Sequence, residues 1–353
     1  MSLNVITKKL IGDPSSLTPA EIDDALTAIL LDDNVHELQV AAFIVAARAT
    51  NRDHTPDFIA TTVANLRRHA RKVVPLPGTE TNEYADIVGT GGDGQNTFNV
   101  STTSAIVAAG TGKLKVAKHG GPASTSMSGA SDLLTHLHVD LSKVTDISTP
   151  ELLKDNDFVY MSGPVFHPIL AKMKPIRKNL GIPTVFNLVG PLLNPLNVKA
   201  RVLGVYTPSL GRVYAEAVKS LFPGSRALVV CGYEGLDEIS PAGKSHVWEL
   251  EVSGDIKEYS LSPEEFGLAS HSLSTVASGS PDENASTVRD LVDGQLPEGH
   301  PILDYVLQNT AALLYVSGSA SSFRNGVEIA RESITSGGAK RALDKFVAAV
   351  KTL

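Results

Sequence analysis

The chain has 353 residues, 42% of them hydrophobic and 20% charged, so it can bury a sizeable core and is long enough for two domains. Its net charge of −7 argues against a nucleic-acid-binding protein, although local fields and metal ions still allow phosphate ligands. The single cysteine, Cys231, excludes intrachain disulfides and cysteine zinc sites, and no signal peptide or membrane-length apolar run is evident. A cytoplasmic globular protein is therefore expected.

The N-terminal part of the chain is predicted to be helical. In the segment SLTPAEIDDALTAIL, Thr18 and Glu21 have the spacing of a capping box, which marks a helix start. A second helix is expected over about 35–47, and a third begins near 55, where apolar residues recur at helical spacing. The segment 74–82 combines Pro, Gly and polar residues, which indicates a linker.

After this linker, short β-branched runs alternate with helical patterns, which is typical of an α/β domain with a mainly parallel sheet. The runs are YADIVG, LKVAKHG, DFVYMSG, RVLGVY and ALVVCG. Two runs of alternating polarity, HVWELEV and DIKEYSL, predict a hairpin appended to the sheet. Three helical patterns follow from about Ser286, the last with a break at Gly337-Gly338. We expect a small all-helical N-terminal domain and a larger α/β domain.

The stretch DIVGTGGDGQNTFNVSTTSAIVAAG, residues 86–110, combines a short strand, a glycine-rich loop and a small-residue helix. Its glycines leave backbone N–H groups free to face an anion, as in phosphate-binding loops. It is neither GxxxxGK[ST] nor GxGxxG, and Asp93 within it would repel a bare phosphate. With Asn99, Ser101 and Thr102 at the helix start, Asp93 predicts a phosphate ligand that carries a metal ion. The glycines alone also fit an ordinary turn with Ser101 as N-cap.

Two other strand ends carry candidate ligand groups. Lys118 ends one predicted strand and precedes small hydroxyl residues, which indicates a second anion site, since open α/β sheets bind ligands at these ends. Taken alone, Lys118 is more typical of a solvated surface lysine. Asp237 and Glu238 follow ALVVCG in the turn YEGLDEISP, where they either share Mg²⁺ with substrate phosphates or form a plain acidic turn. Two phosphate-type loops on neighbouring strands imply a ligand with two phosphate groups.

A cationic, helical stretch begins at His167-Pro168 and continues through ILAKMKPIRKNLG. Arg177 is its candidate for binding a carboxylate, because a guanidinium can bind both oxygens at once. A solvated helix face explains most of the other cations. No Ser/His/Asp order or metal-type pair of histidines points to a hydrolase or a zinc enzyme.

The motifs GTGGD with TFNVST, KHGG, HP…R, FN..GPL.NP and GLDE occur in this order over nearly the whole chain. In this combination, the sequence closely resembles the anthranilate phosphoribosyltransferases of tryptophan biosynthesis. The resemblance implies a homodimer whose protomer has a helical domain, 1–75 with a contribution from about 168–195, and an α/β domain, 76–353. It also implies the reaction, in which the amine of anthranilate displaces pyrophosphate from 5-phosphoribosyl diphosphate (PRPP) and gives N-(5-phosphoribosyl)anthranilate, with Mg²⁺ as cofactor.

The resemblance assigns residues to each ligand. PRPP is assigned to Gly89, Gly92, Asp93, Thr97, Asn99, Val100, Ser101, Thr102, Lys118, Ser124, Thr125 and Ser126. Mg²⁺ is assigned to Ser101, Asp237 and Glu238, and catalytic roles to Lys118, Asp237 and Glu238. The anthranilate pocket is assigned to Gly89, His119, Gly121, Arg177, Gly190 and Pro191. The chain departs from the family pattern at Gly121, where Asn is typical, and at Ala130, where Ser is typical.

This reaction passes through an oxocarbenium-like state and needs no strong base, so the protein chiefly positions its substrates and stabilises the departing pyrophosphate. Two alternatives stay open. A pyrimidine nucleoside phosphorylase of the same architecture needs only inorganic phosphate, so the acids Asp237 and Glu238 count against it. A non-enzymatic nucleic-acid-binding relative needs a basic groove, which the net charge of −7 does not favour. We expect small-molecule substrates, with neither nucleic acid nor membrane as a partner.

Overall fold

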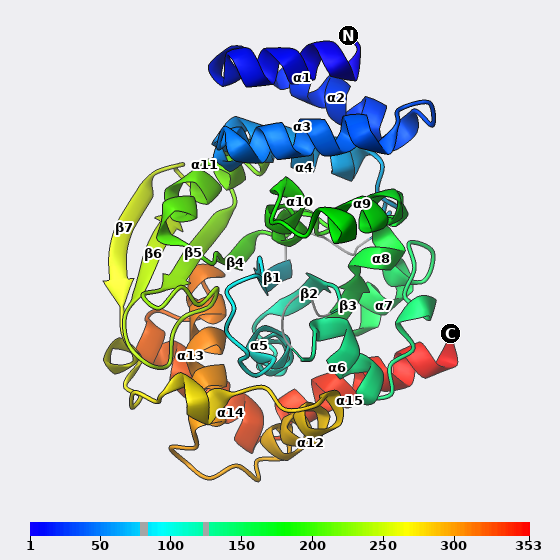
Figure 1. Cartoon of the computed structure of the whole chain (residues 1–353). Coiled ribbons are helices and arrows are strands. Elements are labelled where there is room, and N and C mark those ends of the chain that lie inside the picture. Colours follow the sequence, from blue (N-terminus) through cyan, green and yellow to red (C-terminus); the bar gives the residue numbers. More distant parts are fainter. Residues whose placement is uncertain (78–83, 123–126) are drawn as a thin grey trace.

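The computed structural model describes residues 1–77, 84–122 and 127–353. Four helices form the N-terminal helical domain, which Figure 1 shows stacked at one end of the molecule. They are α1 (Leu3–Gly12), α2 (Pro19–Leu31), α3 (Glu37–Ala49) and α4 (Pro56–Arg68). The predicted capping box is present, since the Thr18 side chain accepts from the backbone of Glu21 while the Glu21 carboxylate accepts from the backbone of Thr18. The predicted helical character of this region is confirmed.

A seven-stranded sheet forms the centre of the α/β domain, in the order β3-β2-β1-β4-β5-β6-β7. Its strands are β1 (Tyr84–Gly89), β2 (Lys115–Gly120), β3 (Phe158–Ser162), β4 (Ala200–Gly204), β5 (Arg226–Gly232), β6 (Ser245–Leu250) and β7 (Ile256–Leu261). Strands β1 to β5 are parallel, whereas β6 and β7 are antiparallel. Each predicted run overlaps one of these strands, and the appended hairpin is confirmed.

The strand order reverses between β1 and β4, and the carboxyl ends at such a switch point are where open α/β sheets bind ligands. The glycine loop follows β1 and leads into α5 (Val100–Ala109), as predicted. The turn YEGLDEISP follows β5, which lies next to β4 and is separated from β1 by that strand alone. The two predicted ligand-binding segments therefore meet at one edge of the sheet.

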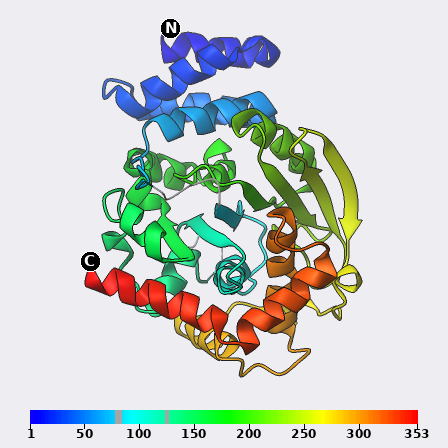
Figure 2. The same ribbon diagram turned by 180° about the vertical axis from the view of Figure 1, so that it is seen from behind.

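Helices cover both faces of the sheet, and the buried apolar residues form two clusters accordingly. One cluster joins Ile87 and Val202 with helices on one face. These include α5, α12 (Pro281–Val292), α13 (Pro301–Val316), α14 (Phe323–Thr335) and α15 (Gly338–Thr352). The other joins Leu203 and Val229 with α11 (Gly211–Leu221) and the helical domain. Figure 2 shows both layers from behind, with the red C-terminal helix opposite the helical domain. The predicted break in the last helical pattern separates α14 from α15.

The segment after β3 lies between the helical domain and the sheet (Figure 1). It contains α8 (Gly163–Phe166), η5 (Pro168–Lys172), α9 (Met173–Leu180), α10 (Val185–Leu188) and η6 (Gly190–Leu192), whereas α6 (Ala130–His136) and α7 (Thr149–Asp155) precede β3. Helix α9 packs on α3 and α10 packs on α4. These contacts agree with a helical contribution from about 168–195, while the exact domain boundaries stay a prediction. None of the described helices combines the length and apolar character that a membrane span needs.

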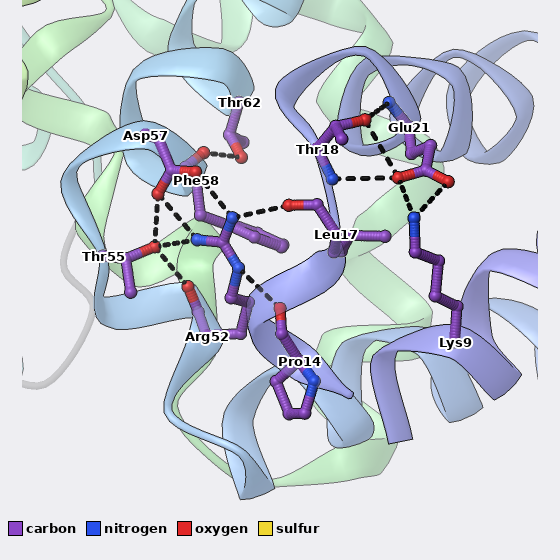
Figure 3. Close-up of polar contacts among 10 residues, drawn as sticks. All are labelled: Lys9, Pro14, Leu17, Thr18, Glu21, Arg52, Thr55, Asp57, Phe58 and Thr62. Atoms are coloured by element: carbon purple, nitrogen blue, oxygen red, sulfur yellow. Dashed lines mark hydrogen bonds and ion pairs between the residues drawn. The ribbon is translucent and has the colours of Figure 1, made fainter. Parts of the chain in front are cut away.

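Arg52, in the short helix η2 (Arg52–His54), connects separate parts of the helical domain (Figure 3). Its guanidinium donates to the backbone carbonyl oxygens of Pro14 (3.1 Å) and Leu17 (2.8 Å), which lie between α1 and α2. It also pairs with Asp57 at the start of α4, at 2.5 Å, while the whole Arg52 residue is 8% exposed. One buried cation thus joins the α1–α2 connection to α4.

We expect Arg52→Ala to lower the free energy of unfolding by about 2–4 kcal/mol, because two carbonyl oxygens and a carboxylate lose a charged donor. Arg68→Ala is the matched control, since Arg68 pairs with Asp23 at 2.7 Å while their side chains are 53% and 32% exposed. That loss should stay below about 1 kcal/mol. Urea denaturation followed by circular dichroism measures both. Equal losses would mean that the buried contacts of Arg52 contribute no more than a surface ion pair.

Candidate functional site

The carboxyl ends of β1 and β4 lie level with each other, and the turn after β5 packs directly on them. Gly89 of β1 is in register with Gly204 of β4. A Cβ atom at Gly89 would lie 2.1 Å from Asp237 Oδ2, and one at Gly204 would lie 1.4 Å from the Asp237 carbonyl oxygen. Only glycine at these two positions lets Asp237 approach the strand ends this closely.

The glycine loop brings Asp93 to the same place. Gly91, Gly92 and Gly94 have φ values of 69°, 81° and 70°, in the left-handed region that glycine adopts at least cost. The Gly91 N–H donates to Asp237 Oδ2 at 2.6 Å, so the loop orients this carboxylate. The carboxyl groups of Asp93 and Asp237 lie within interaction distance of each other. The loop therefore places an acid beside the acidic turn.

Burial raises the pKa of each of these carboxyl groups above its ordinary value. Burial, followed by the charge of Asp93, raises the pKa of Asp237 to about 7, and burial also raises the pKa of Asp93. Burial and the charge of Asp237 raise the pKa of Glu238 well above its usual value. Asp237 is 9% exposed, so the turn is not a solvated one, whereas its binding of Mg²⁺ stays a prediction. A nearby cation would favour the charged forms of these carboxyl groups.

This arrangement fits Mg²⁺ better than a metal held by protein ligands alone. Among the residues that the structure describes, no group of three or more His, Cys, Asp and Glu side chains has the arrangement of a metal-binding set. Mg²⁺ usually keeps several waters and takes only one or two carboxylates, with substrate phosphates completing its shell. The donors at hand, two or three carboxyl groups beside a glycine loop, suit that mode of binding.

The first turn of α5 lies against the carboxyl groups. Ser101 lines, with Asp237 and Glu238, one small cavity of about 10 Å³, roughly the space of a single water. The N-cap of α5 is Asn99, so the alternative with Ser101 as N-cap is wrong. Thr102 Oγ1 is buried without a hydrogen-bond partner, although buried hydroxyls are normally paired. Free N–H groups of a helix start attract anions, so this end of α5 can hold a phosphate group.

Both the nitrogen and the oxygen of the Asn99 side-chain amide already form hydrogen bonds within the protein. Its Nδ2 donates to the Ser128 carbonyl oxygen at 2.7 Å, and its Oδ1 accepts from Asn284 Nδ2 at 2.9 Å. Asn99 thus joins the glycine loop, the segment after β2 and α12. Its assignment to PRPP stays a prediction, as do those of Gly92, Thr97 and Val100.

Lys118 is buried on β2 and is 1% exposed, so the surface-lysine alternative is wrong. Its Nζ donates to the Ile87 carbonyl oxygen of β1 at 2.5 Å. Burial lowers the pKa of Lys118, while the charges of Asp86 and Glu238 oppose that shift. Lys118 is therefore within electrostatic reach of the acidic turn. The predicted turn Ser124, Thr125 and Ser126, which would complete this anion site, lies outside the described residues.

His119 points to the other face of the sheet, because side chains alternate along a strand. Its ring meets that of His167 edge to face, with centroids 5.3 Å apart, and both residues are buried. His167 Nε2 hydrogen-bonds to the Leu193 carbonyl oxygen at 2.7 Å. Leu193 follows η6, which contains Gly190 and Pro191 and packs beside β2. The strand that carries His119 thus lies beside the segment that contains Gly190 and Pro191, and all three residues were assigned to the anthranilate pocket.

Burial lowers the pKa of His119 well below its usual value, and the nearby Gly190 backbone only partly opposes this shift. The His119 ring is consequently neutral at pH 7. Arg177 lies on α9, partly buried, and burial alone lowers the pKa of its guanidinium. In the described part of the chain, no hydrogen bond or ring contact joins Arg177 to His119, so its place in the pocket stays a prediction. At Gly121, where Asn is typical of the family, an added Cβ would meet nothing within 4 Å.

His167 should make stability depend on pH in a defined direction. Burial lowers the pKa of His167 from 6.5 to about 4, so the unfolded chain binds this proton more readily than the folded chain. The corresponding stability is present above pH 6.5 and is lost as the pH falls toward 4. We expect His167→Gln to reduce the loss of unfolding free energy between pH 7 and pH 5 by about 2 kcal/mol.

Urea denaturation at the two pH values measures this difference directly. His136→Gln serves as a control, because the His136 side chain is 36% exposed and lies beside Asp282. An unchanged pH difference in His167→Gln would contradict the assignment of a buried neutral ring.

Sequence reasoning missed two buried residues that organise the site. Tyr305 on α13 donates a hydrogen bond to Glu238 Oε2. Asp86 on β1, 1% exposed, accepts from Asn194 Nδ2 at 2.8 Å and from the His119 backbone. A charged residue inside the predicted strand YADIVG was the available signal for Asp86. Tyr305 lies in an ordinary apolar helical pattern, and nothing local distinguishes it from core.

Comparison with known proteins agrees with this geometry. The model of the glycosyl transferase family helical bundle domain matches residues 3–70, and that of the glycosyl transferase family a/b domain matches residues 81–340. Anthranilate phosphoribosyltransferase of Schizosaccharomyces pombe is 48% identical over 93% of this chain and 92% of its own length. That of Saccharomyces cerevisiae is 43% identical over 98% of both chains. The chain belongs to the anthranilate phosphoribosyltransferase family.

Solved structures of this family have the same fold. Anthranilate phosphoribosyltransferase from Saccharomyces cerevisiae in complex with PRPP and Mg gives a TM-score of 0.92 at 43% identity, over 99% of this chain and 98% of that one. The enzyme from Thermus thermophilus gives a TM-score of 0.87 at 36% identity, over 98% and 99%. The predicted family and fold class, a helical domain beside an α/β domain with a mainly parallel sheet, are thereby confirmed.

Proposed function

We propose that this chain transfers the 5-phosphoribosyl group of PRPP to the amine of anthranilate, releasing pyrophosphate, in cytoplasmic tryptophan biosynthesis. The observation that carries this function is the convergence of Asp93, Asp237 and Glu238 with the glycine loop and the start of α5. Relatives named for this activity cover nearly the whole chain. The yeast enzyme has been solved with PRPP and Mg, and with 4-fluoroanthranilate.

The glycine loop and the first turn of α5 bind PRPP in this proposal, while Ser101, Asp237 and Glu238 hold Mg²⁺. When bound, Mg²⁺ neutralises charge on the departing pyrophosphate. Gly91 orients the Asp237 carboxylate through its N–H group. Lys118 adds a positive charge from the sheet, within reach of Glu238. Catalysis then comes mainly from fixed charges and from holding two substrates in line.

Anthranilate is bound on the side of β2 that carries His119, against Gly190 and Pro191, with Arg177 on its carboxylate. The aromatic amine is neutral at pH 7 and can attack without a base. The neutral His119 ring supports this role, because it offers a polar wall without adding a charge. Asp86 and Asn194 hold the His119 backbone and the segment after η6 together, which keeps the two walls of the pocket in register.

Arg177→Ala should raise the KM for anthranilate about tenfold or more, which corresponds to at least about 1.4 kcal/mol, while the KM for PRPP stays unchanged. The reason is that a guanidinium binds both carboxylate oxygens, which Arg177→Lys cannot reproduce. Saturation curves with anthranilate at fixed high PRPP measure this. Lys178→Ala, one residue along on the exposed side of α9, is the control. If the Arg177 variants and the wild type give identical curves, the carboxylate is bound elsewhere.

We also propose a homodimer through the helical domain. Four apolar side chains are exposed on the adjacent helices α1 and α3: Val5 at 50%, Ile11 at 64%, Leu38 at 74% and Val45 at 38%. Leu38 and Val45 are seven residues apart and share one helix face. Light scattering should give twice the chain mass of 37.3 kDa. Leu38→Glu with Val45→Glu should give the monomer, whereas Val252→Glu, at a site 62% exposed on the β6–β7 hairpin, should not. A monomeric wild type would refute the dimer.

Substrate choice separates this function from the nucleoside phosphorylase alternative. The purified protein should consume anthranilate when given PRPP and Mg²⁺, and should produce no ribose 1-phosphate from uridine and phosphate. The buried carboxyl cluster favours the first outcome, because a phosphorylase has no need for a metal-binding pair of acids. Phosphorolysis without use of PRPP would overturn the proposed function.

A further inference from the structure

Helix α13 runs along the acidic turn and bonds to it at successive residues. Asn309 Oδ1 accepts from the Ile239 N–H, and Asn309 Nδ2 donates to the Ile239 carbonyl oxygen, both at 3.3 Å. Gln308 Nε2 donates to the Ser240 carbonyl oxygen at 2.8 Å. The backbone immediately after Glu238 is therefore fixed to one side of this helix.

Tyr305 lies one helical turn before Asn309, so both side chains face the acidic turn. It is completely buried, and its hydroxyl donates to Glu238 Oε2. Asn309 Nδ2 also donates to the Tyr305 carbonyl oxygen at 3.0 Å, which links the two contacts. Asn309 and Gln308 thus hold the backbone of the turn, whereas Tyr305 holds a carboxylate.

The contact has a direct bearing on metal binding. Asn309 lines the same small cavity as Ser101, Asp237 and Glu238, so α13 forms one wall of the space beside these residues. A free glutamate side chain loses up to about 2 kcal/mol of conformational entropy when it is fixed. A hydrogen bond already present in the ligand-free protein removes part of that cost from metal binding. Groups that orient metal ligands in this way typically change metal affinity about 10- to 100-fold.

We propose that Tyr305 is a positioning residue for the metal site: its hydroxyl binds Glu238 Oε2 and so fixes the carboxylate that would hold Mg²⁺. This inference rests on the proposed assignment of Mg²⁺ to Asp237 and Glu238. Tyr305 lies 67 positions from Glu238 in the sequence, and the hydrogen bond between them is the observation that connects Tyr305 to the metal site.

The experiment compares Tyr305→Phe with wild type in direct Mn²⁺ binding, followed by the electron paramagnetic resonance signal of free Mn²⁺. Removing one oxygen keeps the ring packing, so the melting temperature should change little while Mn²⁺ binds about 10- to 100-fold more weakly. The Mg²⁺ concentration for half-maximal turnover should rise by a similar factor. Tyr84→Phe is the matched control, because the buried Tyr84 hydroxyl donates to the Leu153 carbonyl oxygen at 2.7 Å, away from the acidic turn.

Glu238→Gln separates the assignment of the metal to Glu238 from the positioning role of Tyr305. If this variant binds Mn²⁺ as wild type does, the assignment of the metal to Glu238 is wrong. If it binds weakly while Tyr305→Phe matches wild type, the metal assignment stands and the positioning role is overturned. Because Tyr305 acts through Glu238, adding Tyr305→Phe to Glu238→Gln should cost no further affinity, and fully additive losses would also overturn the proposal.

Discussion

Asp237→Asn combined with Glu238→Gln should abolish turnover at ordinary Mg²⁺ concentrations, with a loss of about 10³-fold or more, while the chain stays folded. The loss corresponds to about 4 kcal/mol of transition-state stabilisation. It follows because the two carboxylates are the proposed metal ligands, and without the metal the departing pyrophosphate lacks charge neutralisation. The amide side chains can still accept the hydrogen bonds from Gly91 and Tyr305 that the carboxylates accept.

The same variant should show a stability gain whose pH dependence follows from the raised pKa values. The pKa of Asp237 is raised from 3.8 to about 7, so its stabilising contribution is present below pH 3.8 and is lost as the pH rises through 7. The Asp237→Asn, Glu238→Gln variant cannot ionise at position 237, so it does not lose this stability as the pH rises. In metal-free buffer, it should gain a few kcal/mol relative to wild type between about pH 4 and pH 8.

A Mg²⁺ titration of activity and urea denaturation at both pH values measure these effects. Glu234→Gln is the matched control, because Glu234 lies in the same turn but is exposed. Near-normal activity of the double variant at every Mg²⁺ concentration would remove both residues from the metal site.

Lys118→Met should lower kcat/KM for PRPP about 10- to 150-fold, with little change in the KM for anthranilate. One charge-assisted contact is worth about 1.5–3 kcal/mol, and Met keeps most of the side-chain volume. Because Lys118 is buried beside Asp86 and Glu238, the variant should also be less stable than wild type. Unfolding must therefore be measured beside the PRPP saturation curve.

Lys115→Met provides the comparison on the same strand, since Lys115 lies at the opposite end of β2 beside the Tyr84 ring. It should leave PRPP use unchanged. A Lys118→Met protein that loses stability but keeps the wild-type PRPP curve would show that Lys118 serves the fold alone.

Local sequence patterns predicted most of the architecture because local forces decide it. The capping box of Thr18 and Glu21 satisfies helix N–H groups within four residues, and the run YADIVG coincides with β1. Glycine adopts a positive φ at least cost, so the loop around Gly91 and Gly92 could also be recognised. These features need no knowledge of distant partners.

The interior of the site depends on partners far apart in sequence, and local patterns could not predict it. Lys118 looks like a surface lysine until β1 and the carboxylates of Asp86 and Glu238 surround it. Tyr305 becomes a partner of Glu238 only when α13 packs against the turn after β5. The family resemblance predicts which residues bind ligands, whereas burial and pairing set their charge states. This is why the acids of the turn were recognised, but the support of α13 was not.

The most direct test of the central claim is the stoichiometry of the products. Purified protein is given PRPP, anthranilate and Mg²⁺, and pyrophosphate and N-(5-phosphoribosyl)anthranilate are measured in the same samples. We predict equal amounts of the two products, no product without anthranilate, and arrest when Mg²⁺ is chelated. Release of pyrophosphate without the anthranilate product, or consumption of anthranilate that does not require PRPP, would contradict the account.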